Sequence, residues 1–202
     1  MTKLNQSIHE QLIELGKQAL YKKDGGFVSI RDICIKGGIN LGLFSYYFKN
    51  KNNFIQVVLK SILDDIEKER EVFLEKYSSL VSIERFKKVI LALIRQMKEQ
   101  SNVYENVLKN IDLCDESFTT YAQDFQNRWI AFFLQLIEEC KDDGYFLPEL
   151  DSNQILAIVF GSVVSYSKSI KDLEPEVFYI KINEMLEFVI GRVAGGGGEK
   201  KF

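Results

Sequence analysis

The strongest constraint on the fold is a spacing of apolar residues at every third or fourth position, which recurs from Ile8 to Val193. Such a period places apolar side chains along one face of an α-helix. The chain has only two prolines, Pro148 and Pro175, among its 202 residues, so few positions interrupt a helix. We therefore predict an all-α fold of about nine helices.

Helix start and stop signals divide this pattern. A first helix presents Ile8, Leu12, Leu15 and Ala19 on one face and ends at a turn over residues 24–26. Further helices are predicted from Ser29 to the glycines at 37–38, from the cap Asn40 to Phe48, from Asn50 to Tyr77, over 83–97, 103–111 and 118–140, from Ser152 to Ile170, and over 175–193. Residues 144–153 are predicted to be a loop, and residues 195–202 a flexible tail.

The composition disfavours several classes of function. Cys34, Cys114 and Cys140 are widely separated, and His9 is the only histidine. We therefore expect no metal site, no cofactor and no enzyme activity. No secretory signal is visible, and the apolar stretch 155–166 is too short to span a bilayer, so we predict a cytoplasmic protein without a membrane span.

Charge is distributed unevenly along the chain. Residues 1–60, which we term the head, hold nine Lys and Arg against four Asp and Glu. The remaining residues hold 17 Lys and Arg against 25 Asp and Glu. A basic head on an acidic body suggests that the head meets a polyanion, although chance clustering of solvated charges is an open alternative.

A helix, a glycine turn and a second helix follow one another between Ser29 and Phe48. The first helix is expected to expose Arg31 and Lys36. The second is expected to expose Asn40, Leu41, Leu43, Ser45, Tyr46 and Tyr47 to different degrees. This is the layout of a helix-turn-helix, whose second helix enters the major groove of DNA.

The segment VSIRDICIKGGINLGLFSYYFKNKNNF, residues 28–54, resembles the DNA-binding motif of the TetR family of transcriptional repressors. The matching positions are Ser29, Ile30, Ile33, Gly38, Ile39, Asn40, Gly42, Phe44, Phe48, Lys51 and Phe54. The chain departs from the family pattern at Ser45, where tyrosine is usual, and at Lys36, where a small residue is typical. The resemblance implies a three-helix DNA-binding domain over residues 1–50 and a larger helical ligand-binding and dimerisation domain over residues 51–194.

The aromatic run of the second helix has two expected roles. Phe44 and Phe48 lie four residues apart and should anchor this helix to the first and fourth helices. Tyr46 and Tyr47 flank that face, and their hydroxyls can bond phosphate oxygens; a purely core role for both rings is the alternative. The predicted DNA-binding set is Ser29, Arg31, Lys36, Asn40, Leu41, Gly42, Leu43, Ser45, Tyr46, Tyr47, Lys49 and Lys51.

The predicted helix over 152–170 is apolar on too many sides to face a single core. The resemblance implies that the last two helices pair with their symmetry mates in a four-helix bundle, and a monomer with a central helix is the alternative. The predicted dimer interface comprises Ile155, Ile158, Val159, Val163, Val164, Phe178, Ile182, Met185, Leu186, Val189 and Ile190.

The resemblance also implies a cavity for a small effector, although periodicity alone indicates only a core stripe. The predicted lining is Met97, Tyr104, Leu108, Cys114, Phe125, Trp129, Phe132 and Phe133, with Asp112, Asp115 and Arg128 as polar contacts. An apolar, aromatic lining favours a hydrophobic or aromatic ligand.

The sequence therefore predicts a homodimeric repressor that binds a palindromic operator in double-stranded DNA and is released by a small hydrophobic effector. A second hypothesis is a helical carrier of hydrophobic molecules whose basic head binds a membrane or a partner instead of DNA.

Overall fold

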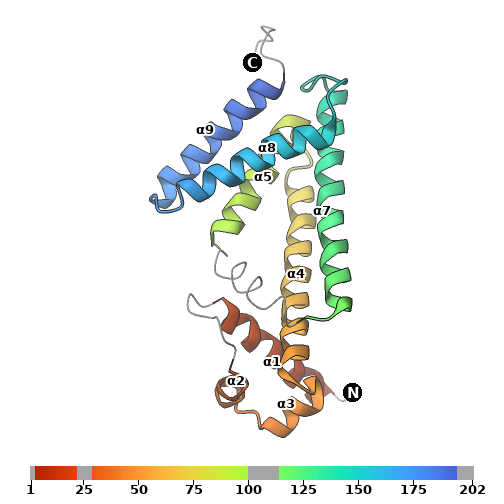
Figure 1. Cartoon of the computed structure of the whole chain (residues 1–202), viewed down its shortest axis with the longest axis vertical. Helices are drawn as coiled ribbons and strands as arrows, with labels where there is room; N and C mark the ends of the chain where they lie inside the picture. The colour runs from red at the N-terminus through yellow and green to blue at the C-terminus, as the bar shows by residue number, and fades with distance from the viewer. Residues whose placement is uncertain (1–2, 22–28, 100–113, 195–202) are drawn as a thin grey trace. The chain divides into compact units, whose positions relative to one another are not determined.

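The structure is a computed structural model that describes residues 3–21, 29–99 and 114–194 (Figure 1). These ranges contain eight α-helices and no strand, so the predicted all-α class is confirmed. The helix predicted over 103–111, the turn predicted at 24–26 and the tail lie outside the described residues.

The helices follow one another in the predicted order. They are α1 (Lys3–Leu20), α2 (Ile30–Gly37), α3 (Leu41–Phe48), α4 (Lys51–Lys76), α5 (Ser82–Glu99), α7 (Glu116–Asp142), α8 (Ser152–Ser169) and α9 (Pro175–Val193). The predicted ends of α4, α8 and α9 lie within one residue of the observed ends. Among the described residues, no helix is long and apolar enough to cross a membrane.

The chain packs into two compact units. The first unit comprises Met1–Glu71 and Gln100–Gln126, and the second comprises Val72–Glu99 and Asn127–Phe202. Helices α4 and α7 therefore contribute residues to both units. The predicted division at residue 50 concerns function and stays a prediction.

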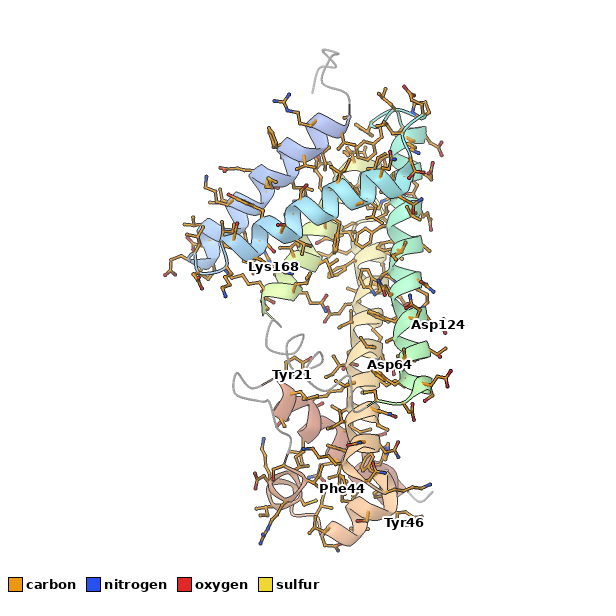
Figure 2. All side chains as sticks on the ribbon, viewed as in Figure 1. Tyr21, Phe44, Tyr46, Asp64, Asp124 and Lys168 are labelled. Atoms are coloured by element: carbon orange, nitrogen blue, oxygen red, sulfur yellow. The ribbon has the colours of Figure 1, made fainter. Side chains whose placement is uncertain are left out.

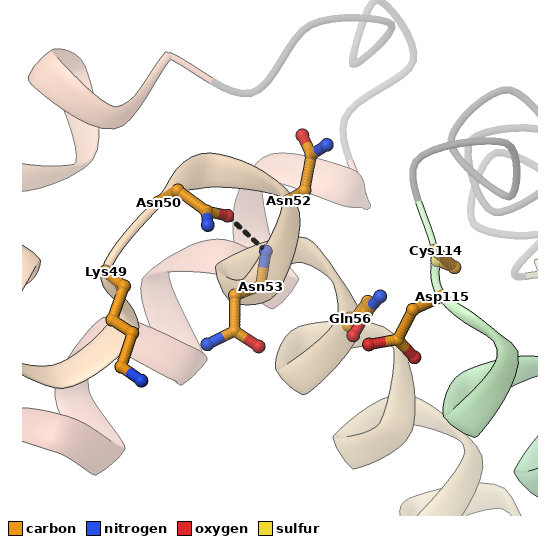
Figure 3. A pocket seen from close by; sticks show the side chains of 7 residues that line it. All are labelled: Lys49, Asn50, Asn52, Asn53, Gln56, Cys114 and Asp115. Carbon is orange, nitrogen blue, oxygen red and sulfur yellow. Dashed lines mark hydrogen bonds between the residues drawn. The ribbon is translucent and has the colours of Figure 1, made fainter.

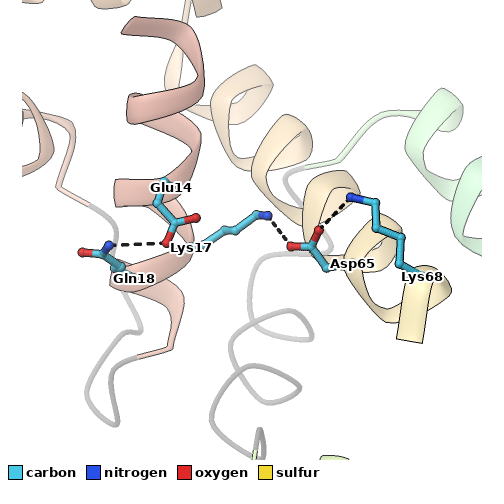
Figure 4. A network of polar contacts seen from close by, with 5 residues as sticks. All are labelled: Glu14, Lys17, Gln18, Asp65 and Lys68. Carbon is cyan, nitrogen blue, oxygen red and sulfur yellow. Dashed lines mark hydrogen bonds and ion pairs between the residues drawn. The ribbon is translucent and has the colours of Figure 1, made fainter. Parts of the chain in front are cut away.

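In the first unit, α1 lies close against α4. A Cβ at Gly16 would come within 2.6 Å of Val58 Cγ2 and 2.7 Å of a Phe54 ring carbon, so only glycine permits this approach. Beside this contact, the Lys17 ammonium pairs with Asp65, which also pairs with Lys68 at 3.3 Å (Figure 4). Burial of these apolar side chains and the ion pair hold α1 on α4.

In the second unit, α8 and α9 pack together, and α5 contacts both of them. Ile155, Val159 and Val163 of α8 are buried, as are Phe178, Ile182 and Leu186 of α9. The nearly buried Lys87 of α5 pairs with Glu84 at 3.0 Å and with Glu187 of α9 at 2.9 Å. A buried ammonium requires such partners, because an unpaired charge in the interior is costly.

Candidate nucleic-acid interface

The turn between α2 and α3 is formed by local hydrogen bonds. The Ser29 hydroxyl accepts from the Asp32 N–H at 3.2 Å and begins α2. Gly38 ends α2 with a φ of +63°, a left-handed conformation that favours glycine. The Asn40 side chain accepts from the Leu43 N–H at 2.8 Å and begins α3, which confirms the predicted cap.

An aromatic cluster fixes α3 to its neighbours. The ring centroids of Phe44 and Phe48 lie 5.2 and 4.8 Å from that of Phe54 on α4. His9 of α1 stacks on Phe48 with centroids 5.0 Å apart. Phe44 and Phe48 are buried, so the prediction that they anchor α3 to the first and fourth helices is confirmed. The helix is held on one face while the other stays accessible.

Helix α3 carries half of the predicted base- and phosphate-contacting residues. Leu41, Gly42, Ser45 and Tyr46 are exposed, and Leu43 and Tyr47 are half-buried. Tyr46 is 71% exposed and points away from the helical core, in contrast to Phe44 (Figure 2). An exposed tyrosine offers both an apolar ring and a hydroxyl for hydrogen bonding.

Basic side chains lie on both sides of this face. Arg31 and Lys36 are exposed on α2, and the Lys36 ammonium donates to Gln18 Oε1 at 2.8 Å. Lys49 is exposed at the end of α3, and Lys51 is half-buried at the start of α4. The exposed Asp32 reduces the positive charge of α2. The arrangement is suited to contact with a polyanion.

Comparison with known proteins agrees with this geometry. No protein-family model matches the chain. A solved structure from a Rhodococcus species, assigned to the TetR family of transcriptional regulators, superposes with a TM-score of 0.65. The match covers 90% of this chain and 98% of the other at 16% sequence identity. The chain therefore has the fold of this TetR-type structure.

One curated protein is also similar in sequence. The HTH-type transcriptional repressor KstR2 of Rhodococcus jostii (strain RHA1) is 21% identical over 142 residues, which is 70% of this chain and 69% of that protein. The similarity therefore extends well beyond a helix-turn-helix segment.

A polar groove lies beside the start of α4 in this TetR-fold protein (Figure 3). It has a volume of about 400 Å³ and is lined by Lys49, Asn50, Asn52, Asn53, Gln56, Cys114 and Asp115. The Asn50 side chain caps α4 by accepting from the Asn53 N–H at 2.9 Å. Burial and the nearby Asp115 raise the pKa of Cys114 to about 11, so the thiol stays protonated and is a poor nucleophile at neutral pH.

Asp115, predicted as a polar contact for the effector, has a structural role. Its Oδ1 accepts from the Ser117 hydroxyl at 2.7 Å and from the Phe118 N–H at 3.1 Å, which begins α7. These hydrogen bonds lower the pKa of the carboxyl group. The other predicted polar contacts differ in placement: Arg128 is exposed on α7, and Asp112 lies outside the described residues.

The residues predicted to line a TetR-type effector cavity are divided between the units. Met97, Trp129, Phe132 and Phe133 belong to the second unit, whereas Cys114 and Phe125 belong to the first. Tyr104 and Leu108 lie outside the described residues. The structure brings three of the set together, because the Trp129 centroid lies 6.0 Å from that of Phe132 and 5.9 Å from that of Phe133.

Most residues of the predicted dimer interface are buried within a single chain. This group comprises Ile155, Val159, Val163, Phe178, Ile182, Leu186, Val189 and Ile190. Val164 and Met185 are half-buried, and Ile158 is exposed. The exposed apolar side chains of α8 and α9 therefore differ from the predicted interface. They are Ile158, which was predicted, and Val177, Ile180 and Phe188, which were not.

Two further side chains lie in surroundings that their residue types do not predict. Ile35 is 70% exposed on α2, about 200° around the helix from the buried Ile33, although its apolar side chain predicts a buried position. Gln96 is buried on α5, although its polarity predicts a surface position. An alignment of related chains could reveal both, whereas hydrophobic periodicity in one sequence does not.

Proposed function

We propose that this protein is a transcriptional repressor that binds a palindromic DNA operator as a homodimer and is released by a small hydrophobic effector. The main support is the accessible face of α3, which carries Leu41, Ser45 and Tyr46 and is held rigidly by the Phe44–Phe48–Phe54 cluster. A similar protein, KstR2, is named a repressor, which favours repression over activation. The domains keep their predicted bounds, with DNA binding over residues 1–50.

The proposed contacts divide into phosphate and base contacts. The Tyr46 and Tyr47 hydroxyls and the ammonium groups of Lys49 and Lys51 contact phosphates, together with Arg31 of α2. Leu41 and Leu43 offer no hydrogen bonds, so they contact thymine methyl groups. The operator is therefore A·T-leaning at the contacted steps, and DNA shape contributes to its selection.

Two heads are required for tight binding. A head with a charge balance of nine basic to four acidic residues neutralises only a small number of phosphates. Two heads that neutralise about eight phosphates together give a slope of about −7 for log affinity against log salt. The two recognition helices lie about 34–36 Å apart or somewhat wider on the palindrome.

The proposed dimer contact is the exposed apolar face of α8 and α9. Val177, Ile180 and Phe188 recur on one side of α9 by helical geometry, and Phe188 is 59% exposed in the single chain. On α8 the exposed Ile158 is followed by Gly161, where an added Cβ would meet no atom within 4 Å. Apolar side chains beside a small residue permit close packing of two helices.

Release follows from a shift between two dimer states. An effector that prefers the state with widely spaced heads lowers DNA affinity in proportion to its differential affinity for the two states. The aromatic residues Trp129, Phe132 and Phe133 are proposed to contact the effector, together with Met97.

The decisive experiment selects binding sites from a random duplex pool and then measures affinity for the selected site across a salt series. We expect a palindrome, nanomolar affinity and a slope near −7. Selection of no site, together with binding of hydrophobic compounds, would instead support the carrier hypothesis. A pool rich in G·C at the contacted steps would refute the proposed role of Leu41 and Leu43.

A further inference from the structure

Gln96 of α5 is a buried polar side chain without a hydrogen-bond partner. It is 6% exposed, and neither its Nε2 nor its Oε1 has a partner among the residues that the structure describes. A buried carboxamide without partners loses its hydration and gains nothing in return. Buried polar atoms in folded proteins are nearly always bonded, so each exception calls for an explanation.

The position of Gln96 on α5 defines what surrounds it. Gln96 follows Arg85 by eleven residues, or about three helical turns, so both side chains project from the same face of α5. Arg85 Nη1 donates to Glu139 Oε2 of α7 at 2.7 Å, so this face of α5 turns toward α7. Ser82, on the same face, lies beside the Cys140 thiol of α7, whose pKa burial raises and Ser82 lowers to a smaller extent.

Helices α5 and α7 run in opposite directions within the second unit (Figure 1). A rise of 1.5 Å per residue puts Gln96 roughly 16 Å along α5 from Arg85. The same distance back along α7 from Glu139 reaches Arg128, the residue before Trp129. Gln96 is therefore level with the aromatic cluster of Trp129, Phe132 and Phe133, which is joined to α8 through Phe160 at 6.0 Å from Phe133.

We propose that Gln96 is the polar anchor of the effector and selects a ligand with a neutral amide, lactam or imide edge on an aromatic body. This inference rests on the proposed function, because it specifies the effector class. A carboxamide presents a donor and an acceptor side by side, and another amide edge satisfies both at once. The aromatic side chains level with it accommodate the apolar body.

The charges near this level favour a neutral ligand over a carboxylate. Arg85 is three turns away and is already paired with Glu139. Lys98 donates to the Lys171 and Leu173 carbonyl oxygens at 3.4 and 3.3 Å and lies over the Phe178 ring. Arg95, next to Gln96, and Arg128 of α7 are both exposed. A carboxylate buried beside Gln96 would therefore lack a buried cation and would bind poorly.

The test compares two probes of similar shape, 2-naphthamide and 2-methylnaphthalene, by isothermal calorimetry without DNA. We expect the wild-type protein to bind the amide at least about tenfold more tightly, which corresponds to a small number of net hydrogen bonds. Gln96→Met retains a similar volume and removes both polar atoms, so it should abolish or reverse this preference. Gln126→Met, at an exposed position of α7, serves as the matched control.

A second readout is independent of any ligand. If Gln96 is unpartnered, Gln96→Met should leave the melting temperature of the free protein unchanged or raise it. A drop of several degrees means that water or the chain already satisfies the amide, and this overturns the assignment. Equal binding of the two probes by the wild type, or binding of neither, also overturns it. Operator binding measured separately without a probe distinguishes this failure from failure of the proposed function.

Discussion

At the scale of single residues, Lys49 combines an exposed charge with a strained backbone. Its φ of 60° is unusual for a residue with a side chain, and its N–H donates to Ser45 O at 3.0 Å at the end of α3. A residue tolerated in such a conformation often has a functional reason to be there. In the proposed function, that reason is a phosphate contact by the ammonium group.

Replacement of Lys49 separates these two effects. Lys49→Gly should stabilise the protein by about 1 kcal/mol, because glycine adopts a positive φ without strain. It should also reduce the salt slope of DNA binding by about 0.9 per head. Urea denaturation and binding across a salt series measure the two quantities. Lys88→Ala, at an exposed position of α5, should change neither; an unchanged slope in Lys49→Gly would exclude the phosphate contact.

Asp65 provides a prediction about pH. Burial opposes ionisation of its carboxyl group, but the hydrogen bonds and charges of Lys17 and Lys68 prevail and lower its pKa below 3.8. The ion pair therefore stabilises the fold above the unfolded-state pKa, and this stabilisation is lost as the pH falls through the lower folded-state pKa. Asp65→Asn should cost about 1 kcal/mol or less at pH 7, since the carboxylate is partly exposed.

The pH dependence of this cost is measured by urea denaturation of both proteins from pH 7 to pH 2. The difference in unfolding free energy should shrink below about pH 4, where the wild-type carboxylate becomes protonated. A difference that stays constant down to pH 2 would mean that the substitution acts through packing.

At the scale of elements, the turn between α2 and α3 requires the left-handed Gly38. Gly38→Ala should cost about 1–2 kcal/mol of stability, and Gly38→Asn should cost less. Because a Cβ at Gly38 meets no atom within 4 Å, the cost is backbone strain alone. Gly144 is the matched control, since it has a φ of +77° and equally open surroundings at the end of α7.

Both alanine variants should therefore lower the melting temperature to a similar extent, whereas only Gly38→Ala should weaken DNA binding. Electrophoretic mobility shifts with the selected operator measure this difference. Equal losses of affinity would indicate that general destabilisation, and not the orientation of α3, governs binding.

Element boundaries were largely predictable from the sequence, because caps and breakers act locally. Ser29, Asn40 and Asn50 each accept from a backbone N–H three residues ahead. The packing partner of each helix was less predictable, because a stripe of apolar residues does not indicate which element covers it. Ile155 and Val159 of α8 are buried within the chain, while Ile158 between them stays exposed.

At the scale of the whole molecule, the exposed α9 face leads to a prediction about assembly. Phe188→Glu should dissociate the dimer and weaken operator binding by at least about tenfold, because a carboxylate buried in an apolar contact is costly even with Arg192 one turn away. The variant should remain folded, since Phe188 is exposed in the single chain. Sedimentation velocity and circular dichroism measure these outcomes.

Val81→Glu provides the matched control, since Val81 is exposed near the start of α5 and outside α8 and α9. It should leave both the dimer and the operator affinity unchanged. If the dimer persists in Phe188→Glu, the interface lies on another surface. The predicted set could not separate core from interface, because both consist of apolar residues at the same helical spacing.

Trp129 is the only tryptophan of the chain and is 8% exposed in the second unit. Its fluorescence should therefore be blue-shifted and should report on that unit alone. The first unit contains no tryptophan, so melting of the helix-turn-helix would be invisible at wavelengths that excite only indole. A protein that retains its native emission while circular dichroism falls would have lost the first unit and kept the second. Fluorescence and circular dichroism together could thus follow the two units separately.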